Sequence, residues 1–294
     1  MASFVARFAL VLSFGLLVGA SGAETGSDGE PVEARPALPA PPPWNELGPG
    51  LELGTFVAAR PSDVGDSRIR VLRVDPARWE LVLLNASADP TMGNRTVGDW
   101  VETEGLVAAI NASMYQMDHS TSTAHMERAG HVNNPRWTTD NATLAFDVRP
   151  GEASRGPLTI LDPACDDVPA GRSAYRTLVQ SIRMLRCDGV NVWSQQDTRW
   201  SHAAIGLDGS GRALFVHARS PWSTHDFIDL LRELPLDLRR LQYAEGGPEA
   251  SLSVKAGGVR LDLFGSYETG FFESDDNDRP WPVPNVVGVR AKSE

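Results

Sequence analysis

The chain has 294 residues, of which 41% are hydrophobic, and a formal net charge of −11 at pH 7. This apolar share is enough to fill the core of a globular protein, which excludes a fibrous or disordered chain. The negative charge, without a basic stripe interleaved with aromatic residues, argues against a nucleic-acid partner. An anionic substrate would need a local cluster of Arg side chains.

The first 43 residues predict export. Arg7 precedes an apolar run from Phe8 to Ala20, and small residues follow up to Ala23. This order is typical of a cleaved signal peptide over residues 1–23, and the run is too short for a stable membrane span. The Pro-rich residues 24–43 are predicted to form an extended linker. We therefore expect a secreted or periplasmic protein.

Apolar runs of strand length recur in the first half of the folded region. They predict strands at Arg68–Val74, Trp79–Leu84, Val107–Ile110 and Leu144–Val148. The first two, joined by a short Pro-containing turn, are expected to form a meander. Residues 44–105 should then supply N-terminal strands that pack on a main domain formed by residues 106–294.

Two polar segments contain residue types that bind metals. Residues 111–137 include His119, His125 and His131, whose spacing matches neither a helical pair nor a zinc signature, so we expect no metal site there. The acidic run from Glu273 to Asp278 offers oxygen ligands that suit calcium but lacks the EF-hand pattern. A solvated acidic loop is the alternative, and calcium is the one candidate cofactor.

Cys165 and Cys187 are the two cysteines of the chain. In an oxidising compartment such a pair favours a disulfide, with two unpaired, partly buried thiols as the alternative. A zinc site is not expected, because no CxxC motif or nearby His pair completes a set of ligands.

A hairpin followed by a helix is predicted after residue 200. Ala203–Leu207 and Ala213–Ala218 are apolar runs joined by a turn with two glycines, which indicates a hairpin. Ser223 can cap the apolar positions that recur at helical spacing from Phe227 to Leu234. We expect this helix to cover the hairpin.

The next buried strand, Leu241–Ala244, ends in the sequence Glu245-Gly246-Gly247-Pro248. The glycines leave the backbone open to close approach by a ligand or another chain segment. A carboxylate at this strand end is placed to receive a proton or to bind a cation. A structural role for Glu245 is the alternative.

These motifs together resemble the phosphodiester glycosidase family. The hairpin AAIGLDGSGRALFV and the turn YAEGGPEASL are similar to the R-x-A-I-G-x-D-x-x-G hairpin and the L-D-G-G-x-S turn of that family. Further similar segments are VAAINASMYQMD, GHVNNPRW, QSIRML and PVPNVVGV, which extend the resemblance over Leu106–Val289. The resemblance implies an α+β fold of antiparallel sheets with flanking helices, and hydrolysis of a sugar from a sugar-1-phosphate diester.

The resemblance also implies roles for individual residues. The catalytic residues would be Glu245, His202 and Glu249. Glu245 or His202 would be the acid that assists departure of the phosphate or manages the incoming water, with Glu249 as a second carboxylate. The substrate-binding residues would be Asn111, Arg136, Arg183, Gly246 and Gly247, with the two arginines holding phosphate oxygens. Three positions depart from the family pattern: Glu245 replaces an Asp, Glu249 replaces a Ser, and His202 lies at or next to an Arg position.

Several candidates have structural alternatives. Asn111 suits a turn cap, Arg183 suits an ion pair with a neighbouring carboxylate, and His202 suits a retained hydrogen bond. The altered positions leave open a second function, a non-catalytic cell-envelope glycan-binding protein with tryptophans as stacking faces. An ordinary glycosidase would need two carboxylates at a suitable separation. The expected partner is a carbohydrate or sugar phosphodiester, and the oligomeric state stays open.

Overall fold

The structure is a computed structural model that describes residues 43–89, 91 and 93–292. The predicted signal peptide and all of the predicted linker except Pro43 lie outside the described residues. The described residues belong to one compact unit, Pro41–Glu294.

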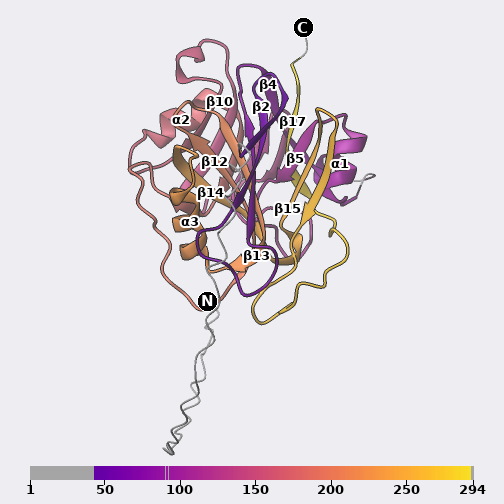
Figure 1. The fold of residues 1–294 in the computed structure, drawn as a ribbon. Helices are drawn as coiled ribbons and strands as arrows, with labels where there is room; N and C mark the ends of the chain where they lie inside the picture. Colours follow the sequence, from indigo (N-terminus) through magenta and orange to yellow (C-terminus); the bar gives the residue numbers. More distant parts are fainter. Residues whose placement is uncertain (1–42, 90, 92, 293–294) are drawn as a thin grey trace, which may run out of the picture. The chain divides into compact units, whose positions relative to one another are not determined.

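Three antiparallel sheets make up this unit (Figure 1). The seven-stranded sheet contains, in spatial order, β1 (Trp44–Gly48), β2 (Leu51–Val57), β3 (Arg68–Val74), β13 (Ala213–Trp222), β12 (Trp200–Asp208), β14 (Leu238–Gly246) and β11 (Arg183–Leu185). One five-stranded sheet contains β7 (His131–Asn134), β6 (Met126–Arg128), β10 (Tyr175–Ser181), β8 (Ala142–Val148) and β9 (Leu158–Leu161). The other contains β16 (Val259–Phe264), β15 (Ser251–Ala256), β5 (Ala108–Asn111), β17 (Asn285–Ala291) and β4 (Trp79–Asn85).

The helices are few and short. The α-helices of the described residues are α1 (Val97–Thr103), α2 (Val168–Ala174) and α3 (Thr224–Glu233), and the 3₁₀ turns are η1 (Ala86–Ala88), η2 (Ala153–Arg155) and η3 (Gly247–Glu249). The expected antiparallel sheets are therefore confirmed. The α+β class with flanking helices fits only loosely, because the domain is mainly β.

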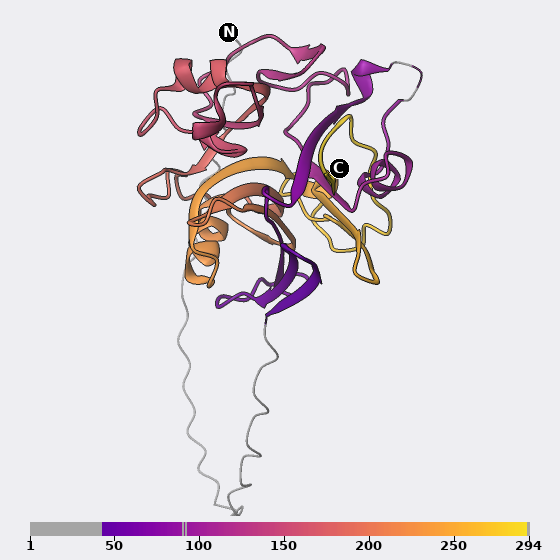
Figure 2. The ribbon, with the colours of Figure 1, turned by 90° about the horizontal axis from the view of Figure 1, so that it is seen from above.

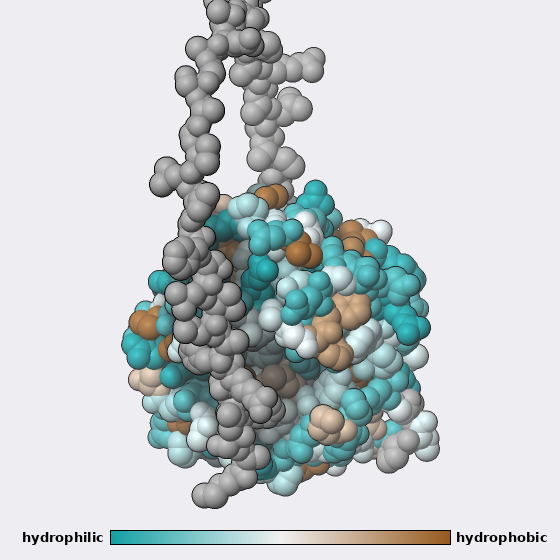
Figure 3. All heavy atoms as spheres, turned by 90° about the horizontal axis from the view of Figure 1, so that it is seen from below, coloured by the Kyte–Doolittle hydropathy of each residue, from teal (hydrophilic) through white to brown (hydrophobic). Residues whose placement is uncertain are grey.

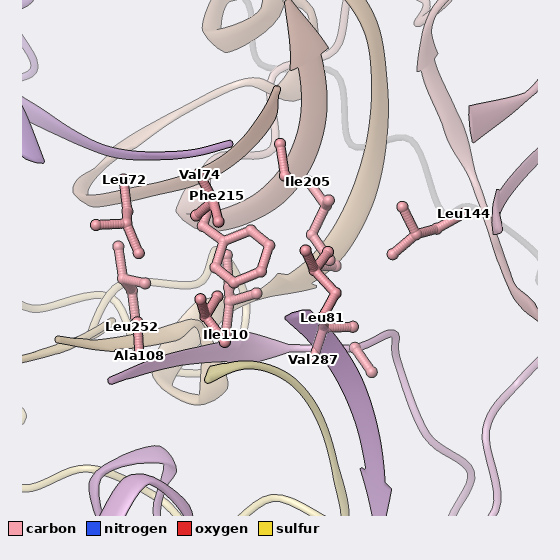
Figure 4. Close-up of a cluster of buried hydrophobic side chains, with 14 of the residues drawn as sticks. Leu72, Val74, Leu81, Ala108, Ile110, Leu144, Ile205, Phe215, Leu252 and Val287 are labelled. Atoms are coloured by element: carbon pink, nitrogen blue, oxygen red, sulfur yellow. The ribbon is translucent and has the colours of Figure 1, made fainter. Parts of the chain in front are cut away.

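The main core lies between the seven-stranded sheet and the two smaller sheets. Figure 4 shows Phe215 and Ile205 of the seven-stranded sheet facing Ile110, Leu252 and Val287 of the sheet that contains β5, β15 and β17. All five side chains are completely buried. Because apolar burial contributes about 25 cal/mol per Å², this layer is the principal source of stability.

Helix α3 covers the other face of the seven-stranded sheet. Ser223 caps it by accepting a hydrogen bond from the backbone N–H of Asp226 at 3.1 Å. Its buried Phe227 and Leu231 belong to the same apolar cluster as Val216 of β13. The predicted hairpin and its covering helix are thus confirmed, since β12 and β13 pair in antiparallel register.

The strands from residues 44–105 are part of these sheets. Strand β3 pairs with β13, and β4 pairs with β17 near the end of the chain. In Figures 1 and 2 the indigo strands lie beside the orange strands of residues 200–250. The N-terminal strands therefore share their hydrogen-bond ladders with strands of residues 106–294.

Cys165 and Cys187 form the expected disulfide. The bond lies beside an ion pair of Arg183 with Asp162, whose second carboxylate oxygen accepts a hydrogen bond from the backbone N–H of Cys187 at 3.0 Å.

The surface face in Figure 3 shows hydrophobic residues as small separate patches among hydrophilic ones. Within the described residues, no helix is both long and apolar enough to cross a bilayer.

Candidate active site

A pocket of about 390 Å³ lies at the end of β14. Four chain segments line it: the loop after β5, the start of β12, the β14 end with its glycine turn, and the loop after β16. The lining residues are Met114, Tyr115, Thr123, Trp200, Tyr243, Glu245, Gly246, Glu249 and Glu268. Two predicted catalytic residues, Glu245 and Glu249, and the predicted binding residue Gly246 are therefore brought together here.

A β-bulge in β14 shapes the pocket wall. Ala203 pairs with Glu245 while its neighbour Ala204 pairs with Tyr243, so Ala244 is the extra residue. A bulge changes the direction in which side chains leave a strand. Tyr243 and Glu245 are two residues apart, so their side chains leave the strand on the same face, and both line the pocket.

The two glycines leave room for the side chains around them. A Cβ at Gly246 would lie 2.0 Å from the hydroxyl of Tyr243 and 2.8 Å from Trp200. Gly247 has φ of +64°, and a Cβ there would lie 2.4 Å from a carboxylate oxygen of Glu268. Both positions therefore exclude larger residues, because the pocket side chains occupy the space that a Cβ needs.

Asn111 fixes the turn that carries Glu249. Its side-chain amide donates to the backbone carbonyl of Glu249 at 3.0 Å, and its side-chain oxygen accepts from the N–H of Ser251 at 2.6 Å. Buried His217 donates from Nε2 to the carbonyl of Ala250 at 3.1 Å. In this geometry Asn111 caps a turn, the alternative that its sequence position left open, and it does not line the pocket.

Three carboxyl groups share the pocket without basic partners. None of Glu245, Glu249 and Glu268 forms a salt bridge in the described part of the chain, and no Lys or Arg is among the residues that line the pocket. Burial, followed by the negative charge of Glu249, raises the pKa of Glu245 well above its usual range. Burial also raises the pKa values of Glu249 and Glu268. The pocket therefore favours protonated carboxyl groups.

The tyrosines respond to the same environment. Burial and then the charges of Glu249 and Glu245 raise the pKa of Tyr115. Burial and then the charge of Glu245 raise the pKa of Tyr243. Both phenols therefore stay protonated and can donate hydrogen bonds into the pocket.

His202, a predicted catalytic residue, lies in the core and is not among the residues that line the pocket. The ring is completely buried, stacks on Phe227 at 4.3 Å, and Nε2 donates to the carbonyl of Trp222 at 3.0 Å. Burial lowers the pKa of His202 to about 3. A neutral ring outside the pocket lining cannot exchange protons with a substrate there, so His202 supports the fold.

Replacing His202 by glutamine should leave turnover at pH 7 within a fewfold of wild type. The lowered pKa makes the unfolded chain bind more protons than the folded one below about pH 6.5, so His202 costs stability as the pH falls toward 3. The unfolding free energy, measured by urea unfolding, should therefore fall less between pH 7 and pH 4 in His202→Gln than in wild type. A folded variant with no activity would instead restore the catalytic role.

The two predicted phosphate-binding arginines lie elsewhere. Arg183 forms its ion pair with buried Asp162 near the disulfide, which is the structural alternative for this residue. Arg136 is exposed, and its backbone N–H donates to Asn134. Neither side chain lines the pocket. The structure therefore does not bring them together with Glu245 and Glu249, and phosphate binding by Arg183 and Arg136 stays a prediction.

Glu268 is a pocket residue that sequence reasoning missed. It lies in the loop after β16, and its backbone N–H donates to the carbonyl of Phe272 at 2.8 Å. Nothing in its sequence neighbourhood, a short polar loop, distinguishes it from a solvated glutamate. Two other lining residues had weak signals in the sequence. Tyr115 is the aromatic residue of the motif that contains Asn111, and Trp200 is one of the tryptophans that could stack on a sugar.

Side chains of the acidic run Glu273–Asp278 form hydrogen bonds and an ion pair with other parts of the chain. Asp275 forms an ion pair with Arg219 at 2.6 Å, and the side chain of Asn277 donates to the carbonyl of Gly265 at 2.7 Å. Glu273 accepts from the N–H of Gly270 at 2.6 Å. Among the residues that the structure describes, no three His, Cys, Asp or Glu side chains cluster in a way that would hold a metal ion.

Comparisons with known proteins agree with the resemblance seen in the sequence. A family model described as phosphodiester glycosidase matches residues 104–290, more than half of the chain. The protein belongs to the phosphodiester glycosidase family. No curated protein matched the chain.

Two solved structures share its fold. The catalytic domain of zebrafish N-acetylglucosamine-1-phosphodiester alpha-N-acetylglucosaminidase, auto-inhibited by its pro-peptide, has a TM-score of 0.58 and 13% identity, over 84% of this chain and 86% of that one. A hypothetical protein from Synechocystis has a TM-score of 0.53 and 15% identity, over 83% of this chain and 62% of that one. At these identities the likeness shows the fold alone.

Proposed function

We propose that the protein is a hydrolase that releases a sugar from a sugar-1-phosphate diester, with Glu245 as the general acid. The observation that carries this proposal is the pocket with three carboxyl groups, whose pKa values are raised in the absence of basic partners. An acid that keeps its proton near neutral pH is suited to protonating a departing oxygen. Family membership supports the substrate class.

In the proposed reaction, the bond between C1 of the sugar and the phosphate oxygen breaks. Protonated Glu245 gives its proton to that oxygen, and the phosphate departs as a phosphomonoester. Water adds to C1, and its proton passes to the carboxylate of Glu249 or Glu268. Glu249 and Glu268 are available to accept this proton when they are ionised.

The pocket has no lining arginine to neutralise the phosphodiester, so protonated Glu245 and the phenols of Tyr115 and Tyr243 would instead donate hydrogen bonds to its oxygens. We expect kcat/KM to fall as the pH rises through the raised pKa of Glu245, because ionisation removes the acid and adds a repulsive charge. Sugar release measured from pH 4 to pH 9, with circular dichroism at each pH to verify folding, tests this. A rate that climbs steadily with pH would contradict it.

The second candidate function is glycan binding without cleavage. Tyr115, Trp200 and Tyr243 line the same pocket and offer aromatic surface to a sugar ring. Glu249 also stands where the resemblance implies a Ser. Saturable binding of a glycan with no product after prolonged incubation would favour this function over hydrolysis.

We also infer that the protein is exported and acts outside the cytoplasm. The apolar run near the N-terminus and the Cys165–Cys187 disulfide support this inference. N-terminal sequencing of protein recovered from the periplasm or medium should find a start close to Glu24. An intact Met1 on protein confined to the cytoplasm would contradict export.

A further inference from the structure

A second pocket, of about 460 Å³, carries the opposite charge from the first. It lies around β6, β7 and β10 of one five-stranded sheet. Arg128 at the end of β6, Arg149 after β8 and Arg176 in β10 line it together with His131 and a single carboxylate, Glu127. We call this set the arginine groove.

The charges of the arginine groove are only partly compensated. The side chain of Arg128 forms no hydrogen bond or ion pair within the described residues, and its buried Nε lacks an acceptor. Arg149 donates from Nε to the carbonyl of Tyr175 at 3.2 Å and has no carboxylate partner there. Arg176 pairs with Asp147 at 2.8 Å, but its own Nε is also buried without an acceptor. A chain with net charge −11 thus holds a local site of positive potential.

His131 reports the same potential. Burial and then the positive charge of Arg128 lower its pKa. Its Nε2 lies 2.9 Å from the hydroxyl of Ser87. His131 is therefore a neutral hydrogen-bonding group at the edge of the arginine groove. The positive charge of the groove comes from the arginines.

The arginine groove is separate from the carboxylate pocket. Strand β10 connects the two regions: Arg176 lies near its beginning, and Ser181 at its end donates to the carbonyl of Tyr243 at 2.5 Å. Five residues of strand correspond to roughly 16 Å. A ligand in the arginine groove therefore does not occupy the proposed active site.

We propose that the arginine groove binds an oxyanion, of the phosphate or sulfate class, carried on a glycan. Guanidinium groups bind such oxyanions through paired N–H donors, and Arg128 and Arg149 have donors to offer. Glu127 accepts hydrogen bonds from sugar hydroxyls but repels a continuous anionic surface, which favours a saccharide over a lipid bilayer. This proposal does not depend on the hydrolytic one.

Isothermal titration of the full protein with a sulfated tetrasaccharide tests the proposal, with the unsulfated tetrasaccharide and inorganic phosphate as further probes. We expect the wild type to bind the sulfated probe and Arg128→Gln/Arg149→Gln to bind it roughly tenfold or more weakly. The matched control Arg78→Gln/Arg239→Gln removes two exposed arginines elsewhere and should leave binding unchanged. Thermal melts verify that both variants are folded.

Three results would overturn the proposal. The first is that the wild type fails to bind the sulfated tetrasaccharide, and the second is that the folded groove variant binds it as tightly as the control. The third result is that the protein binds anionic phosphatidylglycerol vesicles in an Arg128-dependent manner but does not bind the sulfated probe. That result would assign the arginine groove to a membrane surface. Stronger binding of the sulfated than of the unsulfated probe, weakening with added salt, supports it.

Discussion

Replacing Glu245 by glutamine should reduce the rate of sugar release by a factor of about 10²–10⁴, the usual contribution of a positioned general acid. Glutamine keeps the shape of the side chain but has no transferable proton. The hydrogen bond from the N–H of Gly246 to the side-chain oxygen of residue 245, 3.2 Å in the wild type, can be retained. A folded Glu245→Gln protein with wild-type turnover would remove Glu245 from the mechanism.

The same substitution has a second, independent readout. Because the folded protein raises the pKa of Glu245, ionisation of this side chain destabilises the fold as the pH rises. Glu245→Gln should therefore melt at a higher temperature than wild type at pH 8, with a smaller difference at pH 4.5. As control, Glu233→Gln removes a glutamate that pairs with Arg60 on the surface and should change neither turnover nor the pH dependence of melting.

Replacing Asn111 by alanine should lower both stability and turnover. The variant leaves the N–H of Ser251 without its side-chain acceptor and removes one of two donors to the carbonyl of Glu249, which keeps the Ser251 hydroxyl at 3.0 Å. We expect a cost of roughly 1–3 kcal/mol in unfolding free energy. The released turn then displaces Glu249 from its position in the pocket. Misplacement of a catalytic group by about an ångström can cost on the order of a hundredfold in rate.

Asn191→Ala is the matched control for this variant. The amide of Asn191 donates to the carbonyl of His225 and to the carboxylate of Asp229, away from the pocket lining. It should lose stability while keeping turnover, measured at a temperature where both variants are fully folded. If Asn111→Ala retained full turnover under those conditions, the turn would not need Asn111 to place Glu249.

The parts of the fold that depend on local sequence could be predicted. The run Arg68–Val74 coincides with β3, and Ser223 caps α3, because strand alternation and capping are determined by neighbouring residues. The relative amounts of sheet and helix were harder to predict from the sequence. The predicted α+β class gave the helices too much weight, since the two smaller sheets, rather than helices, cover one face of the large sheet.

The candidate site was predicted in part for a similar reason. Glu245 and Glu249 belong to one continuous motif, and the structure places both in one pocket. Glu268 reaches that pocket from a distant loop, which no local pattern indicates. His202 and Arg183 have the right chemistry, but the side of a strand on which a residue lies and the presence of a partner such as Asp162 are decided by tertiary packing.

The most direct test is to incubate the protein with a panel of sugar-1-phosphodiesters between pH 5 and pH 8 and to detect released sugar by mass spectrometry. The proposed function predicts release from at least one member, decreasing toward high pH and lost in Glu245→Gln. No release from any member, by a folded protein that binds the panel members saturably, would contradict the proposed hydrolysis and favour a binding protein on the same fold.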